Sequence, residues 1–168
     1  MLRFVLIVAV LLVSVISYLG LERLLYVDEN KAQVYFYYNE HLRPLECAID
    51  GGGPPLDTAL RALLRGPAAE AKAKNIQTLL PPDLQITARH LENGVLTLTF
   101  NDALLRMSGG HQNIHGALRQ IVFTATQIKG IKSVSFRVQG FTGSTLVIGG
   151  EGYIIDRPLD RNYFKGAR

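Results

Sequence analysis

Two histidines four residues apart, His111 and His115, have a spacing that could serve a metal site. In a helix, such residues share a face, so both imidazoles could bind one Zn²⁺ ion. A zinc site needs a third or fourth ligand, and the nearest upstream carboxylate is Asp102. The HExxH pattern, whose glutamate acts as a general base, does not occur. We therefore predict no metal and no cofactor, and we expect these histidines and His90 to lie at the rim of the surface.

The other residues that could carry chemistry lack the partners that such sites require. Ser108–Gly110 and Gly51–Gly53 are glycine-rich, but neither has the lysine or the spacing of a phosphate-binding loop. No histidine or asparagine lies near Cys47 in the sequence in the arrangement of a cysteine nucleophile motif. For a serine nucleophile, no GxSxG or SxxK motif occurs. The sequence therefore predicts a protein that is not an enzyme. An envelope hydrolase stays an alternative, because catalytic groups can be assembled from distant positions.

Composition sets further bounds. The formal net charge is +4, and the charges alternate in sign along the chain without a long block of one sign. This distribution lacks the cluster of Lys and Arg that is typical of nucleic-acid-binding proteins, so no nucleic-acid partner is predicted. A single cysteine excludes a disulfide within the chain.

The first part of the chain predicts a membrane anchor. Residues 4–21 contain no charge and no proline, and as a helix they reach about the ~30 Å of a bilayer's hydrocarbon layer. Arg3 precedes this run, which favours a cytoplasmic N-terminus and an extracytoplasmic remainder. We assign residues 1–26 to a single-pass anchor in the cell membrane and residues 27–32 to a spacer. A cleaved signal peptide is the alternative.

The remaining chain alternates between strand-like and helix-like patterns. The predicted fold class is α+β: after the transmembrane helix comes a two-layer sandwich of one small, mostly antiparallel sheet with two helices on one face. The domain is assigned to residues 33–152, and residues 153–168 are expected to form a solvated C-terminal tail. The expected elements are strands at 33–38, 42–49 and 133–139, a hairpin at 86–100, and helices at 56–65 and within 108–127. The stretch near 146–148 is expected to form a last edge strand or a loop.

The register of the hairpin can be argued from its turn. A two-residue Asn93–Gly94 turn would pair Arg89 with Leu98 and place a charge on the apolar face. A three-residue loop over 92–94 would pair Ala88 with Leu98 instead and make that face almost wholly apolar. Because burial of an apolar face selects the register, we predict the three-residue loop.

An ordered series of short motifs runs through the predicted domain: VYF at 34–36, LLRGP at 63–67, LPP at 80–82, LRQIVFT at 118–124, IKSV at 131–134 and VQG at 138–140. Over roughly residues 33–150 this series resembles the GerMN (sporulation and spore germination) domain family. The resemblance implies a small extracytoplasmic α/β module without catalytic residues, similar to ring-building domains of envelope assemblies. Such modules occur in sporulation and germination proteins and in lipoproteins of bacteria that form no spores. A membrane span and a single domain copy depart from the family's commonest layout.

The aromatic strand supplies the predicted interface. Tyr35 and Tyr37 share one face of it, and tyrosine is enriched at protein interfaces. Strand edges near Val34–Tyr38 or Leu146–Ile148 could each dock a partner by strand addition. We expect a membrane-anchored, non-catalytic interaction or assembly module that binds other envelope proteins, with a homo-oligomer left open. The alternative is an extracytoplasmic sensor domain that binds cell-wall glycan or a small ligand.

Overall fold

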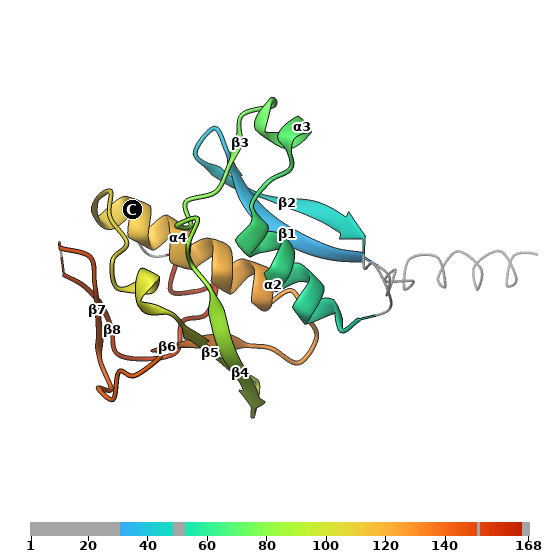
Figure 1. The fold of residues 1–168 in the computed structure, drawn as a ribbon. Helices are drawn as coiled ribbons and strands as arrows, with labels where there is room; N and C mark the ends of the chain where they lie inside the picture. The colour runs from blue at the N-terminus through green and yellow to red at the C-terminus, as the bar shows by residue number, and fades with distance from the viewer. Residues whose placement is uncertain (1–30, 49–52, 151, 166–168) are drawn as a thin grey trace, which may run out of the picture.

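The computed structural model describes residues 31–48, 53–150 and 152–165 (Figure 1). The predicted anchor at 1–26 and most of the spacer at 27–32 lie outside these residues. The first strand begins at Lys31, so the last two spacer residues already belong to the domain. Within the described part of the chain, no helix combines the length and the apolar character that crossing a bilayer requires.

Strands and helices alternate along the chain. The helices are α2 (Pro55–Arg65), α3 (Ala69–Lys72), the short 3₁₀ helix η2 (Asp102–Leu104) and α4 (Gly110–Ala125). The strands are β1 (Lys31–Tyr38), β2 (His41–Ala48), β3 (Ile76–Gln77), β4 (Ile86–Glu92), β5 (Val95–Phe100), β6 (Ser133–Val138), β7 (Leu146–Ile148) and β8 (Tyr153–Ile155).

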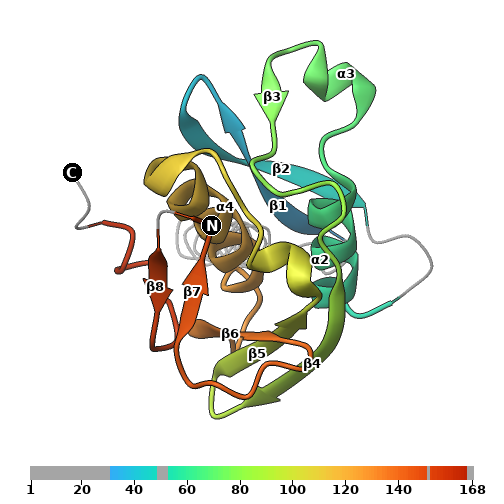
Figure 2. The ribbon, with the colours of Figure 1, turned by 60° about the vertical axis from the view of Figure 1, so that its left-hand side comes forward.

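The α+β class is confirmed, but the expectation of one sheet is wrong. The strands form three small sheets, with orders β2-β1-β3, β4-β5-β6 and β7-β8. Helix α4 runs between them, with β7 and β8 on one side and α2 on the other (Figure 2). It also connects β5 to β6, and these two strands are therefore parallel, as a helical crossover allows.

Helix α4 forms the centre of the core. The apolar pattern predicts a stripe of Ile114, Leu118, Ile121, Val122, Ala125 and Ile128; the first five are almost fully buried, and Ile128, just beyond the helix, is partly buried. The predicted face of α2 holds Leu56, Leu60, Leu63 and Leu64, of which the first three are buried and Leu64 is partly buried. It ends at Gly66, whose φ of 80° suits glycine and stops the helix as expected.

The hairpin has the register that the burial argument rejected. Asn93 and Gly94 form a two-residue turn with φ values of 51° and 85°, the positive values that a type I′ turn requires. Arg89 therefore lies opposite Leu98, and the predicted three-residue loop is wrong. The physical reason is that β4 is exposed along nearly its whole length, so burial exerts no selection on it. A β-bulge just after Ile86 shifts the register, so that Ile86 lies opposite Phe100.

The C-terminal residues are part of the domain and not a solvated tail. Tyr153, Ile155, Leu159 and Phe164 are each at most 5% exposed. Leu159 also forms an isolated antiparallel bridge with Val134 of β6. Leu159 therefore pairs with the outer edge of β6 at Val134, a contact that the charges of this segment do not indicate.

Candidate functional site

Strand β1 has no free edge, because helix α4 satisfies its backbone with side chains. Gln127 Nε2 donates to the carbonyl of Gln33 at 2.8 Å, and Thr124 Oγ1 accepts from the N–H of Tyr35 at 3.0 Å. Gln120 is fully buried; its Nε2 donates to the carbonyl of Tyr35 at 3.0 Å. We call Gln120, Thr124 and Gln127 the polar ladder of α4, where Gln127 lies in the turn just after the helix ends at Ala125. Their spacing of i, i+4 and i+7 is that of one helix face.

The other edge of β1 is occupied by β2 over its full length. Tyr35 lies opposite Pro44, and its N–H and C=O point toward α4, so the missing N–H of Pro44 costs no bond between the strands. Beyond Tyr35, the edge toward α4 pairs with β3 at Tyr37 and Tyr38. The prediction that Val34–Tyr38 docks a partner by strand addition is therefore wrong.

The two predicted interface tyrosines point toward α4 and are half-buried. The ring of Tyr35 packs edge-on against Phe123, with centroids 5.6 Å apart, and the guanidinium carbon of Arg161 lies 5.5 Å from its centroid. Tyr35 is thus a packing residue of the domain. Tyr37 lies further along and contributes to an open cleft.

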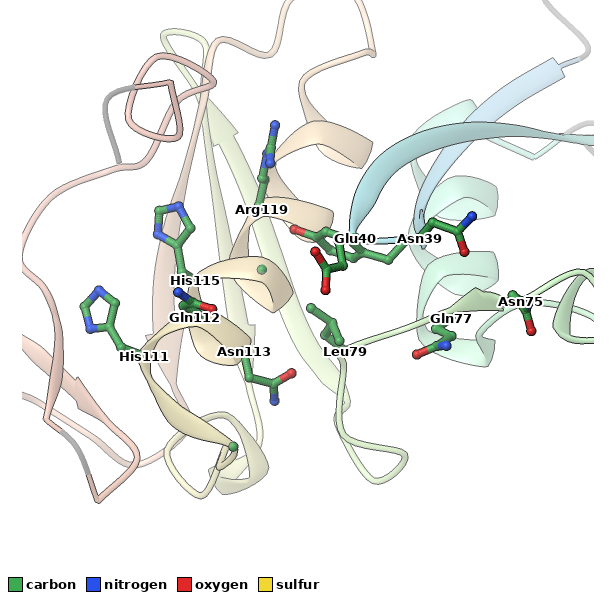
Figure 3. Close-up of a pocket in the computed structure, with 13 residues that line it drawn as sticks. Asn39, Glu40, Asn75, Gln77, Leu79, His111, Gln112, Asn113, His115 and Arg119 are labelled. Atoms are coloured by element: carbon green, nitrogen blue, oxygen red, sulfur yellow. The ribbon is translucent and has the colours of Figure 1, made fainter. Parts of the chain in front are cut away.

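That cleft has both polar and apolar lining and a volume of about 1040 Å³. The turn between β1 and β2, the strand β3 and the first half of α4 form its walls (Figure 3). Its lining is rich in amide side chains: Asn39, Asn75, Gln77, Gln112 and Asn113.

Tyr37 and Arg119 lie together at one end of the cleft lining. Burial raises the pKa of the Tyr37 hydroxyl, although the charge of Arg119 and a hydrogen bond with it act in the opposite direction. Tyr37 and Leu79 can pack closely against α4 because residue 116 is a glycine. A Cβ atom at this position would lie 3.1 Å from the Tyr37 hydroxyl and 2.5 Å from Leu79 Cδ1. The guanidinium carbon of Arg119 lies 5.2 Å from the centroid of Phe123.

The two histidines whose spacing could serve a metal site, His111 and His115, also line this cleft. Their rings are stacked with centroids 6.4 Å apart. His115 Nδ1 lies 2.9 Å from the hydroxyl of Tyr153, which in turn lies 3.0 Å from the hydroxyl of Tyr163. Burial lowers the pKa of His115, and the neighbouring His111 and Arg119 lower it further. These contacts attach the C-terminal segment to α4.

The remaining candidate side chains, those of His90, Cys47 and Asp102, do not line the cleft. Within the described residues, no group of three or more His, Cys, Asp or Glu side chains could hold a metal ion. His90 lies on the exposed strand β4 near Glu92, with 3.7 Å between Nε2 and the carboxylate. Cys47 Sγ donates to the carbonyl of Ala32 at 3.2 Å. Asp102 pairs with Arg106 instead of a histidine.

Strand β4 is a second surface of interest because it stands at the edge of its sheet. Its pairing with β5 leaves its other side without a strand among the residues that the structure describes. In a two-residue hairpin the pair flanking the turn is the hydrogen-bonded kind. By alternation, the N–H and C=O groups of Arg89 and Leu91 point away from β5. Leu91 is also 48% exposed, which is high for a leucine.

Of the two possibilities expected near Leu146–Ile148, the structure shows the strand, and it pairs with β8. Val147 and Ile154 lie opposite each other on the outer face of this pair and are 54% and 59% exposed. Sequence reasoning found this strand but missed both Arg119 and the edge of β4. The available signal for Arg119 was a charged residue next to the apolar stripe of a strongly patterned helix.

A comparison with protein families gives one match. The profile described as "Sporulation and spore germination" (Germane) matches residues 26–143, which extends from just before β1 to just beyond β6. It confirms the resemblance drawn from the ordered motifs. No curated protein matches the chain significantly.

Solved structures of GerMN domains share this fold. The tandem GerMN domains of the sporulation protein GerM from Bacillus subtilis are 25% identical, with a TM-score of 0.61 over 78% of this chain. This chain covers 44% of that tandem structure, which is less than half its length. The first GerMN domain of the same protein is 16% identical, with a TM-score of 0.62 over 79% of this chain and 98% of that one. The latter likeness is one of fold alone.

Proposed function

This chain belongs to the sporulation and spore germination (GerMN) family, and from that premise we propose that it is a membrane-anchored, extracytoplasmic interaction module without catalytic activity. Its partner is another protein of the bacterial envelope. The partner contributes an extended segment that adds to the free edge of β4. The exposed backbone of that edge is the observation that carries the proposal.

The apolar segment at residues 4–21 supports the anchoring. If it stays in the membrane, the domain that begins at Lys31 is held within a few residues of the bilayer surface. Tethering of this kind raises the effective concentration of a module for partners in the same membrane, so a modest contact surface is sufficient.

The geometry of β4 supports strand addition. After the bulge that follows Ile86, the strand pairs regularly with β5 up to Glu92. Two outward N–H groups and two outward carbonyls, from Arg89 and Leu91, are then available to an incoming strand. Asp57 of α2 forms a salt bridge with Arg89 that fixes the strand against the domain. The edge of β4 is therefore already in place before a partner binds, so this protein loses little conformational entropy on binding.

The test is cross-linking in intact membranes with the full-length protein, followed by identification of the captured proteins. Leu91→Pro removes an outward N–H group without removing a bond to β5, and it should abolish the specific capture. Leu91→Ala is the matched control, because it removes the same exposed side chain and keeps the N–H group. Capture that is equal in the two variants would contradict docking at this edge.

Thermal unfolding of both variants separates a docking defect from a folding defect. The expected melting temperatures are close to that of the unmodified protein, because position 91 is exposed and its N–H group does not bond within the sheet. Deleting the outer domain while keeping residues 1–26 should also abolish capture. Capture by the anchor alone would contradict the assignment of the interaction to this domain.

A further inference from the structure

We propose that the cleft between α4 and the β1–β2 turn binds an acidic saccharide, with Arg119 holding the sugar carboxylate. This inference goes beyond the proposed interaction at β4 and does not depend on it. Strand β3 and the β1–β2 turn, which line the cleft, lie toward one end of the domain, whereas the tip of the β4 hairpin lies toward the other (Figure 1).

The state of Arg119 is the first argument. Its Nε atom is buried and has no hydrogen-bond partner within the described part of the chain. None of the ion pairs among the described residues involves it. Its guanidinium packs near the ring of Phe123 and interacts with the hydroxyl of Tyr37, so the side chain is held in place. A positioned, partly desolvated guanidinium without a carboxylate partner is a favourable site for one.

The lining of the cleft is the second argument, because it indicates what carries the carboxylate. Pockets for apolar ligands are lined mainly by hydrophobic and aromatic side chains. Here, five of the thirteen lining residues are amides, among them Asn39, Gln77 and Gln112. Each amide both donates and accepts hydrogen bonds, which suits the hydroxyl and acetamido groups of a sugar. The volume of about 1040 Å³ is large enough for more than one sugar ring.

Glu40 is the lining residue whose charge opposes an anion, and it provides an internal check. It lies on the β1–β2 turn, on the other wall of the cleft from Arg119, and it is exposed (Figure 3). Water therefore screens its repulsion, whereas Arg119 is partly withdrawn from water. If the bound group is an anion, removing the charge of Glu40 should strengthen binding and removing that of Arg119 should weaken it.

The experiment is a calorimetric titration of the full-length protein in detergent with N-acetylmuramic acid and glucuronic acid. N-acetylglucosamine is the neutral probe, since it keeps the hydroxyl and acetamido groups without the carboxylate. We expect both acids to bind about tenfold or more tightly than the neutral sugar, the effect of one charge-assisted bidentate contact. A short oligosaccharide that contains glucuronic acid separates the two sources: tighter binding than the free acid assigns the site to a glycan polymer, and equal binding assigns it to a free sugar acid.

Three variants complete the test. Arg119→Gln should weaken binding of the acids about tenfold or more and leave the neutral sugar unchanged, while Arg119→Lys should give an intermediate loss. Glu40→Gln should bind the acids at least as tightly as the unmodified protein, and this exposed change keeps the test valid if Arg119→Gln fails to fold. The proposal is overturned if no probe binds, if acidic and neutral sugars bind equally, or if Glu40→Gln weakens binding of the acids. Leu91→Pro should leave all these affinities unchanged, so failure of docking at β4 is distinguishable from failure here.

Discussion

Replacing Gln120 with leucine should destabilise the domain more than any other change in the polar ladder of α4. The side chain is fully buried and serves two backbone groups of other segments. Its Oε1 accepts from the N–H of Leu79 at 2.7 Å, and its Nε2 donates to the carbonyl of Tyr35 at 3.0 Å. Leucine has a similar volume and no polar atom, so it fills the space and leaves both groups without a partner.

The magnitude follows from those two groups. Each buried backbone donor or acceptor that loses its partner costs about 1–3 kcal/mol, so Gln120→Leu should lower the free energy of unfolding by about 2–6 kcal/mol. Thr124→Val removes a single acceptor, the one for the N–H of Tyr35, and should cost about 1–3 kcal/mol. Gln127→Leu is the control: its bonds to Gln33 are exposed, water can replace them, and the cost should stay below about 1 kcal/mol.

Equilibrium urea unfolding followed by circular dichroism measures all three variants. With a slope of about 1–3 kcal/mol per molar urea, the loss at Gln120 should move the midpoint by about 1 M or more. The reasoning requires the order Gln120, then Thr124, then Gln127. If Gln120→Leu unfolds at the same urea concentration as Gln127→Leu, the ladder does not secure the edge of β1, and strand addition at Val34–Tyr38 becomes open again.

Three further predictions test other parts of the structure. Leu159→Ala should lower the free energy of unfolding by about 2–5 kcal/mol, because Leu159 is 1% exposed, whereas a solvated tail would leave urea unfolding unchanged. Since burial lowers the pKa of His115 below its ordinary 6.5, the unfolded chain takes up the proton more readily, and stability should fall as pH drops below about 6.5. His115→Gln should flatten that part of the dependence of melting temperature on pH, and an unchanged slope would contradict the assignment. A reporter enzyme that is active only outside the cytoplasm should be active when fused after residue 168, and activity confined to a cytoplasmic reporter would contradict the predicted orientation.

The parts of the fold that the sequence predicted are those with a local signal. Helix α4 carries its apolar stripe within a few turns, and α2 is bounded by prolines before it and Gly66–Pro67 after it. The ordered motifs were sufficient to indicate the family. Each of these features depends on residues that are close in the chain, where periodicity and capping act directly.

The errors at β1 and at the C-terminal segment arose where one segment meets another that is distant in the sequence, whereas the error in the hairpin register is local. Tyr35 and Thr124 are 89 positions apart, and nothing local indicates that a threonine on α4 will close the edge of β1. The hairpin register was argued from burial, but β4 is exposed and its turn decides the pairing. The C-terminal residues carry charges at intervals, which suggested solvent, although Leu159 between them pairs with β6.

The residues of helix α4 explain why hydrophobic periodicity in the sequence did not predict the candidate site. Its apolar stripe packs in the core, its polar ladder binds β1, and a third set of residues, His111, His115 and Arg119, lines the cleft. A hydrophobic pattern identifies the first stripe and assigns every other position to solvent. In this helix two of the remaining directions are occupied, one by a strand and one by a cleft. The positions that the hydrophobic pattern assigns to solvent are therefore the ones where polar residues such as Arg119 are available for binding.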